Sequence, residues 1–207
     1  MSRLIESICI QNGEIRNLEF HQERLNRSRW KLFGLNDELN LRKCIESRLL
    51  SGVEANRDFG IKQEKAKCRI LYDEKIHSVE INPYQIRKIH SVKLIENNEI
   101  DYRFKFENRT AFELMKDSVA EDEIIIVKNG KITDTSYSNL VFFDGENWIT
   151  PKTFLLNGTM RQYLLNSKQI IEKEVSINDL KSFQSFKLIN AMMNLEESPA
   201  LDISVIV

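Results

Sequence analysis

Three polar features in the second half of the chain have the residue types for chemistry: a lysine, an aspartate and the start of a helix. Lys105 lies between two phenylalanines on a short apolar segment, and Asp134 lies near the end of a predicted strand. Further on, Asn157-Gly158-Thr159 is typical of residues that open a helix, where the first backbone N–H groups lack helical partners and favour an anion. The combination predicts an anion site with an amine and a carboxylate beside it.

The stretch that carries two of these features, residues 132–161, predicts a compact run of elements. It reads as a strand ending in a polar turn, a second strand, a glycine hairpin, a third strand that stops at Thr150-Pro151, and then the helix. Just before it, residues 124–127 form a strongly apolar strand, and Asn129-Gly130 is a hairpin signal. These strands and turns would position Asp134 and the helix start.

The first part of the chain predicts a hairpin followed by a helix. Residues 4–10 predict a strand, Asn12-Gly13 a hairpin turn, and residues 14–18 the return strand. Helical spacing follows over residues 20–33, with Gly34 as a plausible C-terminal stop. The residues expected near one face of this helix are Phe20, Leu25, Ser28 and Leu32.

A second helix is expected from Asp37, as its cap, to about residue 50, where Ser51-Gly52 would break it. Residues 67–72 and 76–83 predict two strands, and Pro83 indicates that the second is an edge strand. Later segments predict further elements: helices over 109–118, 159–167 and from 178, and strands over 170–175 and 186–190.

Strands and helices in two runs indicate an α+β protein with two lobes. The polar, acidic segment 95–101 is the best candidate for a crossing between them, which gives an N-terminal α/β lobe over 1–95 and a β-rich lobe over 96–207. Ligands favour the cleft between lobes, so we expect the site there.

Composition excludes several classes of protein. The 207 residues carry 30 Lys plus Arg against 31 Asp plus Glu, so a net charge of -1 offers no whole-protein field for nucleic acid or an anionic membrane. No secretion signal or membrane-length apolar run is present, and the three cysteines have no pairing or zinc spacing. We expect a cytoplasmic protein with no metal site; the basic run Arg27, Arg29 and Lys31 is expected to be a solvated helix face.

Four segments together carry a family resemblance: YRFKFENR from Tyr102, ITDTSYSNLVF from Ile132, WITPKTFLLNGTMRQYLL from Trp148, and LINAMMNLEESPAL from Leu188. The ordered set resembles the class IV aminotransferases, the fold-type IV pyridoxal-phosphate enzymes, and within them 4-amino-4-deoxychorismate lyase. LIESICIQNGEI and FHQERLNRS resemble the family's front strand and helix more loosely. The resemblance implies a small α/β sandwich lobe, a β-rich pseudo-barrel lobe, the cofactor in the interlobe cleft and a homodimer.

The resemblance also assigns roles to residues. Pyridoxal phosphate needs a lysine amine, an acid at its ring nitrogen and a cationic cup rich in N–H groups for its phosphate. Lys105 would be the Schiff-base lysine and would then move the substrate's α-proton. Asp134, where the family usually has Glu, would meet the ring nitrogen. The other residues that the resemblance assigns to the cofactor are Arg24, Asn139, Gly158, Thr159, Asn190 and Ala191.

Each of these residues also has an ordinary structural explanation. Lys105 fits an amphipathic strand, and Asp134 fits a turn in which Asp binds its own backbone. Arg24 could be a surface arginine paired with Glu23 or Ser28, and residues 190–192 a core strand end. Residues assigned to the substrate are Ser7, Arg69 and Tyr102.

Two departures from the family bear on substrate recognition rather than cofactor binding. The chain begins almost directly on the front strand, without the hairpin that usually precedes it, and Asp73-Glu74-Lys75 replaces a glycine-rich turn. The expected reaction is release of pyruvate and 4-aminobenzoate from 4-amino-4-deoxychorismate, in folate synthesis. The alternatives are a branched-chain or D-amino acid aminotransferase and, from another class, a non-catalytic binding protein that keeps the fold.

Overall fold

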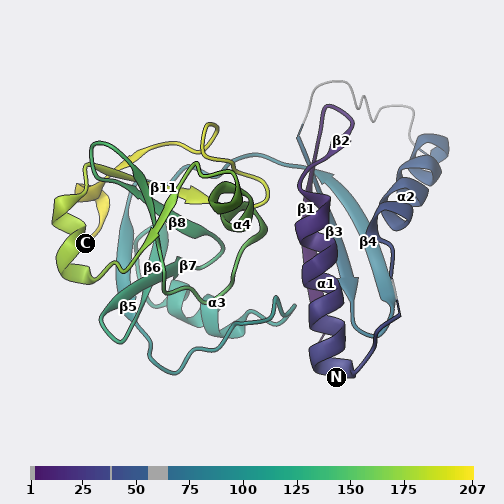
Figure 1. Cartoon of the computed structure of the whole chain (residues 1–207), viewed down its shortest axis with the longest axis horizontal. Helices are drawn as coiled ribbons and strands as arrows, with labels where there is room; N and C mark the ends of the chain where they lie inside the picture. Colours follow the sequence, from purple (N-terminus) through teal and green to yellow (C-terminus); the bar gives the residue numbers. More distant parts are fainter. Residues whose placement is uncertain (1–2, 38, 56–64) are drawn as a thin grey trace. The chain divides into compact units, whose positions relative to one another are not determined.

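The computed structural model describes residues 3–37, 39–55 and 65–207. By its contacts the chain divides into two compact units (Figure 1). Unit 1 is residues 1–85 with 104–108, and unit 2 is residues 86–103 with 109–207. This division differs from the expected lobes in two places, since the strand at 92–96 lies in unit 2 and the segment carrying Lys105 lies in unit 1.

The sheet of unit 1 has the order β2-β1-β3-β4 and is antiparallel. Its strands are β1 (Leu4–Gln11), β2 (Glu14–Ile15), β3 (Ala66–Tyr72) and β4 (Ile76–Pro83), so β4 is the edge strand that Pro83 predicted. The hairpin at Asn12-Gly13 is present, and both residues have the positive φ that such a turn requires.

Side chains alternate across this sheet. One face carries Leu4, Ile8, Cys68 and Ile70, which form the core of the unit with residues of helices α1 (Leu18–Phe33) and α2 (Leu41–Ala55). Figure 1 shows α1 lying along β1 and β3. The opposite face carries Ser7 and Arg69, which are direct partners in the ladder.

Three expectations for the front of the chain are wrong. The return strand stops at Ile15, because Asn17 takes a left-handed conformation and α1 begins at Leu18. The second helix is capped by the side chain of Asn40, which accepts from the Lys43 N–H at 3.0 Å. The helix runs to Ala55, past Gly52, since a glycine inside a helix costs only about 1 kcal/mol.

The buried face of α1 also differs from the expected one. Leu25 and Ser28 are buried as expected, whereas Leu32 is exposed and Phe20 is only half-buried. Apart from Leu18 at the helix start, polar residues take the remaining buried positions: His21, Arg24 and Arg29. Apolar spacing missed this face because it contains charged groups whose partners come from other segments.

Unit 2 holds two sheets. The first has the order β5-β6-β7, made of β5 (Val92–Glu96), β6 (Glu123–Lys128) and β7 (Lys131–Thr135). The second has the order β10-β9-β8-β11-β12. Its strands are β8 (Asn139–Phe143), β9 (Trp148–Pro151), β10 (Ile171–Lys173), β11 (Ser185–Ile189) and β12 (Leu201–Asp202).

The helices of unit 2 are short. They are α3 (Thr110–Asp117), α4 (Thr159–Asn166) and two 3-10 turns, η1 (Ile177–Ser182) and η2 (Ile203–Val205). Met160 and Leu164 of α4 pack on Val141 of β8 and Ile189 of β11, so the start of α4 is tied to the second sheet. The helix expected from Asn178 is the turn η1, whose Ser176 N–H donates to Asp179 at 2.8 Å.

The element content confirms the α+β class. None of the helices in the described part of the chain has the length and apolar character that a membrane crossing requires. Among those same residues, no three His, Cys, Asp or Glu side chains gather as metal ligands would.

Candidate active site

Asp134 lies in an irregular part of β7. The pairing register of β6 and β7 shifts between Ile125 and Val127, and four successive residues of β7, from Ile132 to Thr135, are buried rather than alternate ones. A bulge of this kind re-aims a side chain that a regular strand would direct elsewhere. The Asp134 carboxylate is therefore turned into the interior of unit 2, where it is 6% exposed.

Three donors hold that carboxylate. Asp134 Oδ1 accepts from Asn139 Nδ2 at 2.8 Å, and Oδ2 accepts from the backbone N–H groups of Leu155 at 3.1 Å and Leu156 at 2.9 Å. Burial raises the pKa of Asp134 to about 6, against the lowering effect of these donors and of the charge of Arg161. A carboxylate has about four acceptor sites, so one remains on Oδ1 for a further donor.

The loop before α4 is thus fastened by Asp134, which is not the turn aspartate bound to its own backbone that was the alternative. Gly158 is the N-cap of α4, with no side-chain cap, and Thr159 and Met160 at the helix start are buried. Arg161, also buried, donates to Asn157 Oδ1 at 3.2 Å and to the Pro151 carbonyl at 3.0 Å, and it pairs with Glu172. The helix start predicted as an anion site is therefore well ordered by its neighbours.

The end of β11 reaches the same region of unit 2. Asn190 Nδ2 donates to Ser138 Oγ at 2.7 Å, and its Oδ1 accepts from the Met192 N–H at 2.8 Å. Ser138 immediately precedes Asn139, so the structure brings residues 190–192 next to the start of β8. Ala191 lies within this turn.

Arg109 is a residue of this region that the sequence reasoning did not assign. Its guanidinium donates to the Ser136 carbonyl and lies 3.4 Å from the Tyr102 hydroxyl, with its centre 4.8 Å from the Phe112 ring. It therefore supports the turn between Asp134 and Asn139. The signal was available, because Arg109 closes the Lys-x-x-Asn-Arg segment.

In unit 1, the segment that carries Lys105 lies beside β1. The Lys105 carbonyl accepts from the Ile5 N–H at 2.9 Å, and Phe106 forms an antiparallel bridge with Leu4. Phe104 and Phe106 pack against the core of the unit. The Lys105 side chain between them is half-buried.

Arg24 is not the surface arginine that was the alternative, because it is 4% exposed and paired with Glu6 on β1. Its Nε and Nη2 donate to the two Glu6 oxygens at 2.9 and 2.5 Å, and His21 Nδ1 lies 2.6 Å from the same carboxylate. Burial opposes ionisation of Glu6, but Arg24 and His21 outweigh it and lower its pKa to about 2.

His21 itself is neutral near pH 7. Burial lowers its pKa, as do the charges of Arg24 and Lys105, while the bond to Glu6 opposes the shift. Since an ionised Glu6 can only accept, Nδ1 of the neutral ring must be the donor. The sequence signal for this cluster was a glutamate at an inward position between Leu4 and Ile8, where a charge requires a buried partner.

The two substrate residues assigned in unit 1 lie on the other face of the sheet. Ser7 and Arg69 are opposite each other, and Arg69 lies 3.4 Å from Glu107, which Arg3 also contacts at 2.8 Å. Two arginines therefore share the carboxylate of Glu107.

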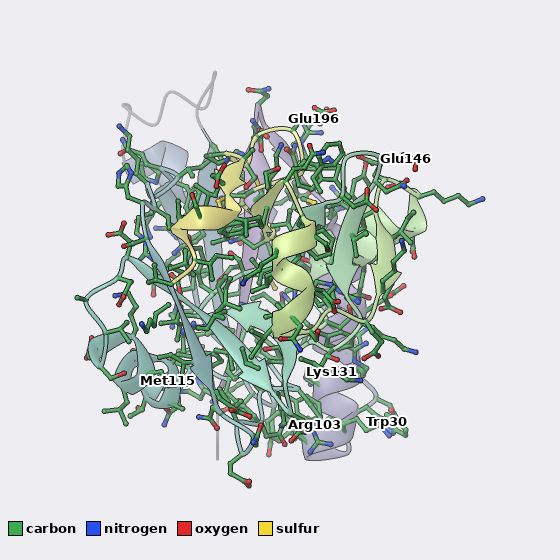
Figure 2. All side chains as sticks on the ribbon, turned by 90° about the vertical axis from the view of Figure 1, so that its left-hand side faces the viewer. Trp30, Arg103, Met115, Lys131, Glu146 and Glu196 are labelled. Atoms are coloured by element: carbon green, nitrogen blue, oxygen red, sulfur yellow. The ribbon has the colours of Figure 1, made fainter. Side chains whose placement is uncertain are left out.

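The basic run on α1 is a solvated face only in part. Trp30 is half exposed at the surface (Figure 2), with Lys31 Nζ 4.1 Å from its ring. Arg29 is instead buried, and it donates to Asp37 and, at 2.7 Å, to the Glu74 carbonyl. The solvated-face expectation is wrong for Arg29, because its partners come from two distant turns.

Solved structures of similar proteins define the fold. The fold is that of solved enzymes such as a hypothetical aminotransferase from Mycobacterium tuberculosis in its PLP-bound form, with a TM-score of 0.74 at 16% identity over 97% of this chain and 80% of that one. The chain also matches a candidate 4-amino-4-deoxychorismate lyase from Haemophilus somnus 129PT, with a TM-score of 0.81 and 33% identity over 94% of this chain and 98% of that one.

The family follows from sequence. The model of the amino-transferase class IV family matches residues 3–196, and an uncharacterized protein of Haemophilus influenzae is 33% identical over 94% of this chain and 100% of its own length. The chain belongs to the class IV aminotransferase family. It is therefore an enzyme of the pyridoxal-phosphate-dependent class, which confirms the resemblance and the cofactor.

Proposed function

We propose that this enzyme is a lyase that releases pyruvate from 4-amino-4-deoxychorismate and leaves 4-aminobenzoate. The observation that carries the proposal is the buried, three-donor carboxylate of Asp134, fastened to the start of α4 in one unit of a class IV chain. The 33% identity to the Haemophilus somnus protein supports the lyase reaction over the others in the family.

The residues of this chain fit the cofactor. Within unit 2, Asp134 retains one acceptor site on Oδ1 for the ring N–H, and the start of α4 at Gly158-Thr159 would receive the phosphate, with residues 190–191 as further donors. Arg24 of unit 1 uses Nε and Nη2 on Glu6, so any bond to the phosphate would come from Nη1. Lys105 would hold the group covalently. When bound, pyridoxal phosphate supplies the electron sink for the bond that breaks beside the substrate's amine.

The work of the chain's own residues then divides clearly. The Lys105 amine would take the proton from the carbon that bears the substrate's amino group, as a general base. Asp134, kept as a carboxylate by its three donors, would hold a proton on the ring nitrogen. The C–O bond to the side chain then breaks, and the side chain leaves as enolpyruvate, which takes up a proton to become pyruvate. The substrate ring becomes aromatic, so no acceptor is consumed. Arg69 and Ser7 would orient the substrate's carboxylates.

The product assay tests this proposal. Purified enzyme with 4-amino-4-deoxychorismate, and without any 2-oxo acid, should release pyruvate and 4-aminobenzoate in equal amounts. Strict dependence on a 2-oxo acid acceptor, with branched-chain or D-amino acids as donors, would contradict the lyase and support the aminotransferase. Asp134→Asn should lower turnover much more than cofactor retention, because the amide cannot hold the ring proton as an ion pair.

We also propose that the enzyme acts as a homodimer in the cytoplasm, as part of folate synthesis. Light scattering of the purified protein at several concentrations measures the assembly. A mass of one chain throughout would contradict the dimer.

A further inference from the structure

Asn139, the first residue of β8, joins three segments of unit 2. Its Nδ2 donates both to Asp134 Oδ1 at 2.8 Å and to the Leu156 carbonyl at 2.9 Å, and the residue is 6% exposed. The two N–H groups of a side-chain amide are thereby used within the protein. Asn139 is therefore occupied in holding Asp134 and the loop before α4.

The other end of the same amide meets Gly158. A Cβ at Gly158 would lie 2.1 Å from Asn139 Oδ1, far inside van der Waals contact. The backbone of Gly158, with φ -66° and ψ 147°, is extended and open to any residue. Glycine at this helix start is thus required by the Asn139 side chain and not by the backbone conformation.

The aspartate completes the arrangement from the other side. Asp134 Oδ2 accepts from the N–H groups of Leu155 and Leu156, the residues that lead into α4. The segment from Leu155 to Gly158 is consequently held between Asp134 and Asn139 by three hydrogen bonds and one close contact.

We propose that Asn139 is a positioning residue that locks the Asp134 carboxylate and the start of α4 into one unit, with Gly158 as its steric counterpart. Its role for the cofactor rests on the proposed function, because the lock would couple the ring-nitrogen partner to the phosphate site. The lock itself is a property of the chain and can be measured separately.

Hydrogen exchange in the full chain, with and without added pyridoxal phosphate, tests the lock. Asn139→Ala should increase the exchange rates of the Leu155 and Leu156 amides by at least about ten-fold, because their acceptor loses its support. Asn166→Ala, at the exposed end of α4, is the matched control and should leave both rates unchanged. Unchanged rates in Asn139→Ala would overturn the proposal.

A double-mutant cycle tests the steric part. Gly158→Ala should lower the folding equilibrium constant roughly ten- to one-hundred-fold in the natural background, but less than about two-fold when Asn139 is alanine. Equal losses in the two backgrounds would show that Asn139 is not what excludes a side chain at position 158.

Positioning is tested by two readouts that a purely structural role would leave alone. The pKa of the Asp134 carboxyl, measured by NMR titration, should be higher in Asn139→Ala than in the natural protein and unchanged in Asn166→Ala. Gly158→Ala should weaken binding of pyridoxal phosphate much more than binding of pyridoxal, which lacks the phosphate. If neither compound binds the natural protein, the proposed function is wrong, and the hydrogen-exchange and double-mutant results still show whether the lock exists. If both compounds bind and Gly158→Ala weakens their binding equally, the lock is not coupled to the phosphate site.

Discussion

Two buried carboxylates, Glu6 in unit 1 and Asp134 in unit 2, have pKa values displaced in opposite directions. At Glu6, burial is outweighed by the charge and hydrogen bonds of Arg24 together with the interaction with His21. Asp134 has neutral donors and a more distant arginine, so burial prevails. The number and charge of the donors therefore decide the ionisation of each. Glu6 stays ionised at any physiological pH, while Asp134 titrates near pH 6.

Glu6→Gln should destabilise the protein by about 3 kcal/mol, because it leaves the buried Arg24 charge without its partner. Urea unfolding at pH 7 measures the loss. Glu14→Gln, which removes an exposed partner of Arg16, is the matched control and should change the free energy of unfolding by less than about 0.5 kcal/mol. A Glu6→Gln protein as stable as the natural one would show that the cluster does not hold β1 and α1 together.

Asp134 gives a distinct pH dependence of stability. Its pKa rises from 3.8 to about 6 on folding, so the folded state binds the proton more tightly between these values. The free energy of unfolding should therefore fall as pH rises from about 4 to 6, by roughly 3 kcal/mol, and level off above. Glu6 has the opposite effect on stability, and at lower pH. Because its pKa is lowered on folding, its contribution to the free energy of unfolding is lost as pH falls from about 4.5 towards 2.

The comparison that isolates Asp134 is the difference in unfolding free energy between the natural protein and Asp134→Asn at each pH. As the pH rises from 4 to 6, the natural protein should lose stability relative to Asp134→Asn. A constant difference across this range would mean that Asp134 does not titrate there.

At the scale of elements, Arg29 of α1 links turns that are far apart in sequence. It donates to the backbone and side chain of Asp37, after the helix, and to the carbonyl of Glu74 in the turn between β3 and β4. Four hydrogen bonds from one buried guanidinium fix the end of α1 on the sheet of unit 1. Arg27, two residues earlier on the same helix, is exposed.

Arg29→Ala should accordingly lower the free energy of unfolding by about 2 to 3 kcal/mol, since it removes a buried side chain and its charge-assisted hydrogen bonds to Asp37 and Glu74. Arg27→Ala is the matched control and should lie within about 0.5 kcal/mol of the natural protein. Thermal and urea unfolding compare the two. Equal effects of the two substitutions would indicate that Arg29 is solvated, as the sequence suggested.

The elements show where sequence patterns succeed. Apolar segments and the Asn12-Gly13 turn predicted β1, β3 and the hairpin, because those signals are local. The buried face of α1 could not be predicted, because Arg24 and Arg29 are buried by partners 18 and 8 residues away. In the same way, the bulge that turns Asp134 inwards depends on the pairing of β6 with β7, which apolar spacing does not encode.

At the scale of the whole molecule, motif order was more informative than any single residue. The ordered segments predicted the class IV family and its cofactor, which the family match confirms. The assigned site residues remain predictions, and they fall in both compact units: Ser7, Arg24, Arg69 and Lys105 in unit 1, the rest in unit 2. The contacts that organise them, Glu6 with Arg24 and Asn139 with Gly158, required three-dimensional structure.

The central claim is that Lys105 carries pyridoxal phosphate, and covalent trapping tests it most directly. The purified protein should absorb at about 410 nm, and borohydride should fix the cofactor to the chain. Mass spectrometry of the digested protein should then find the reduced pyridoxyl group on the peptide that contains Lys105, and Lys105→Ala should carry none. A colourless protein after incubation with the cofactor, or the same adduct in Lys105→Ala, would contradict the account.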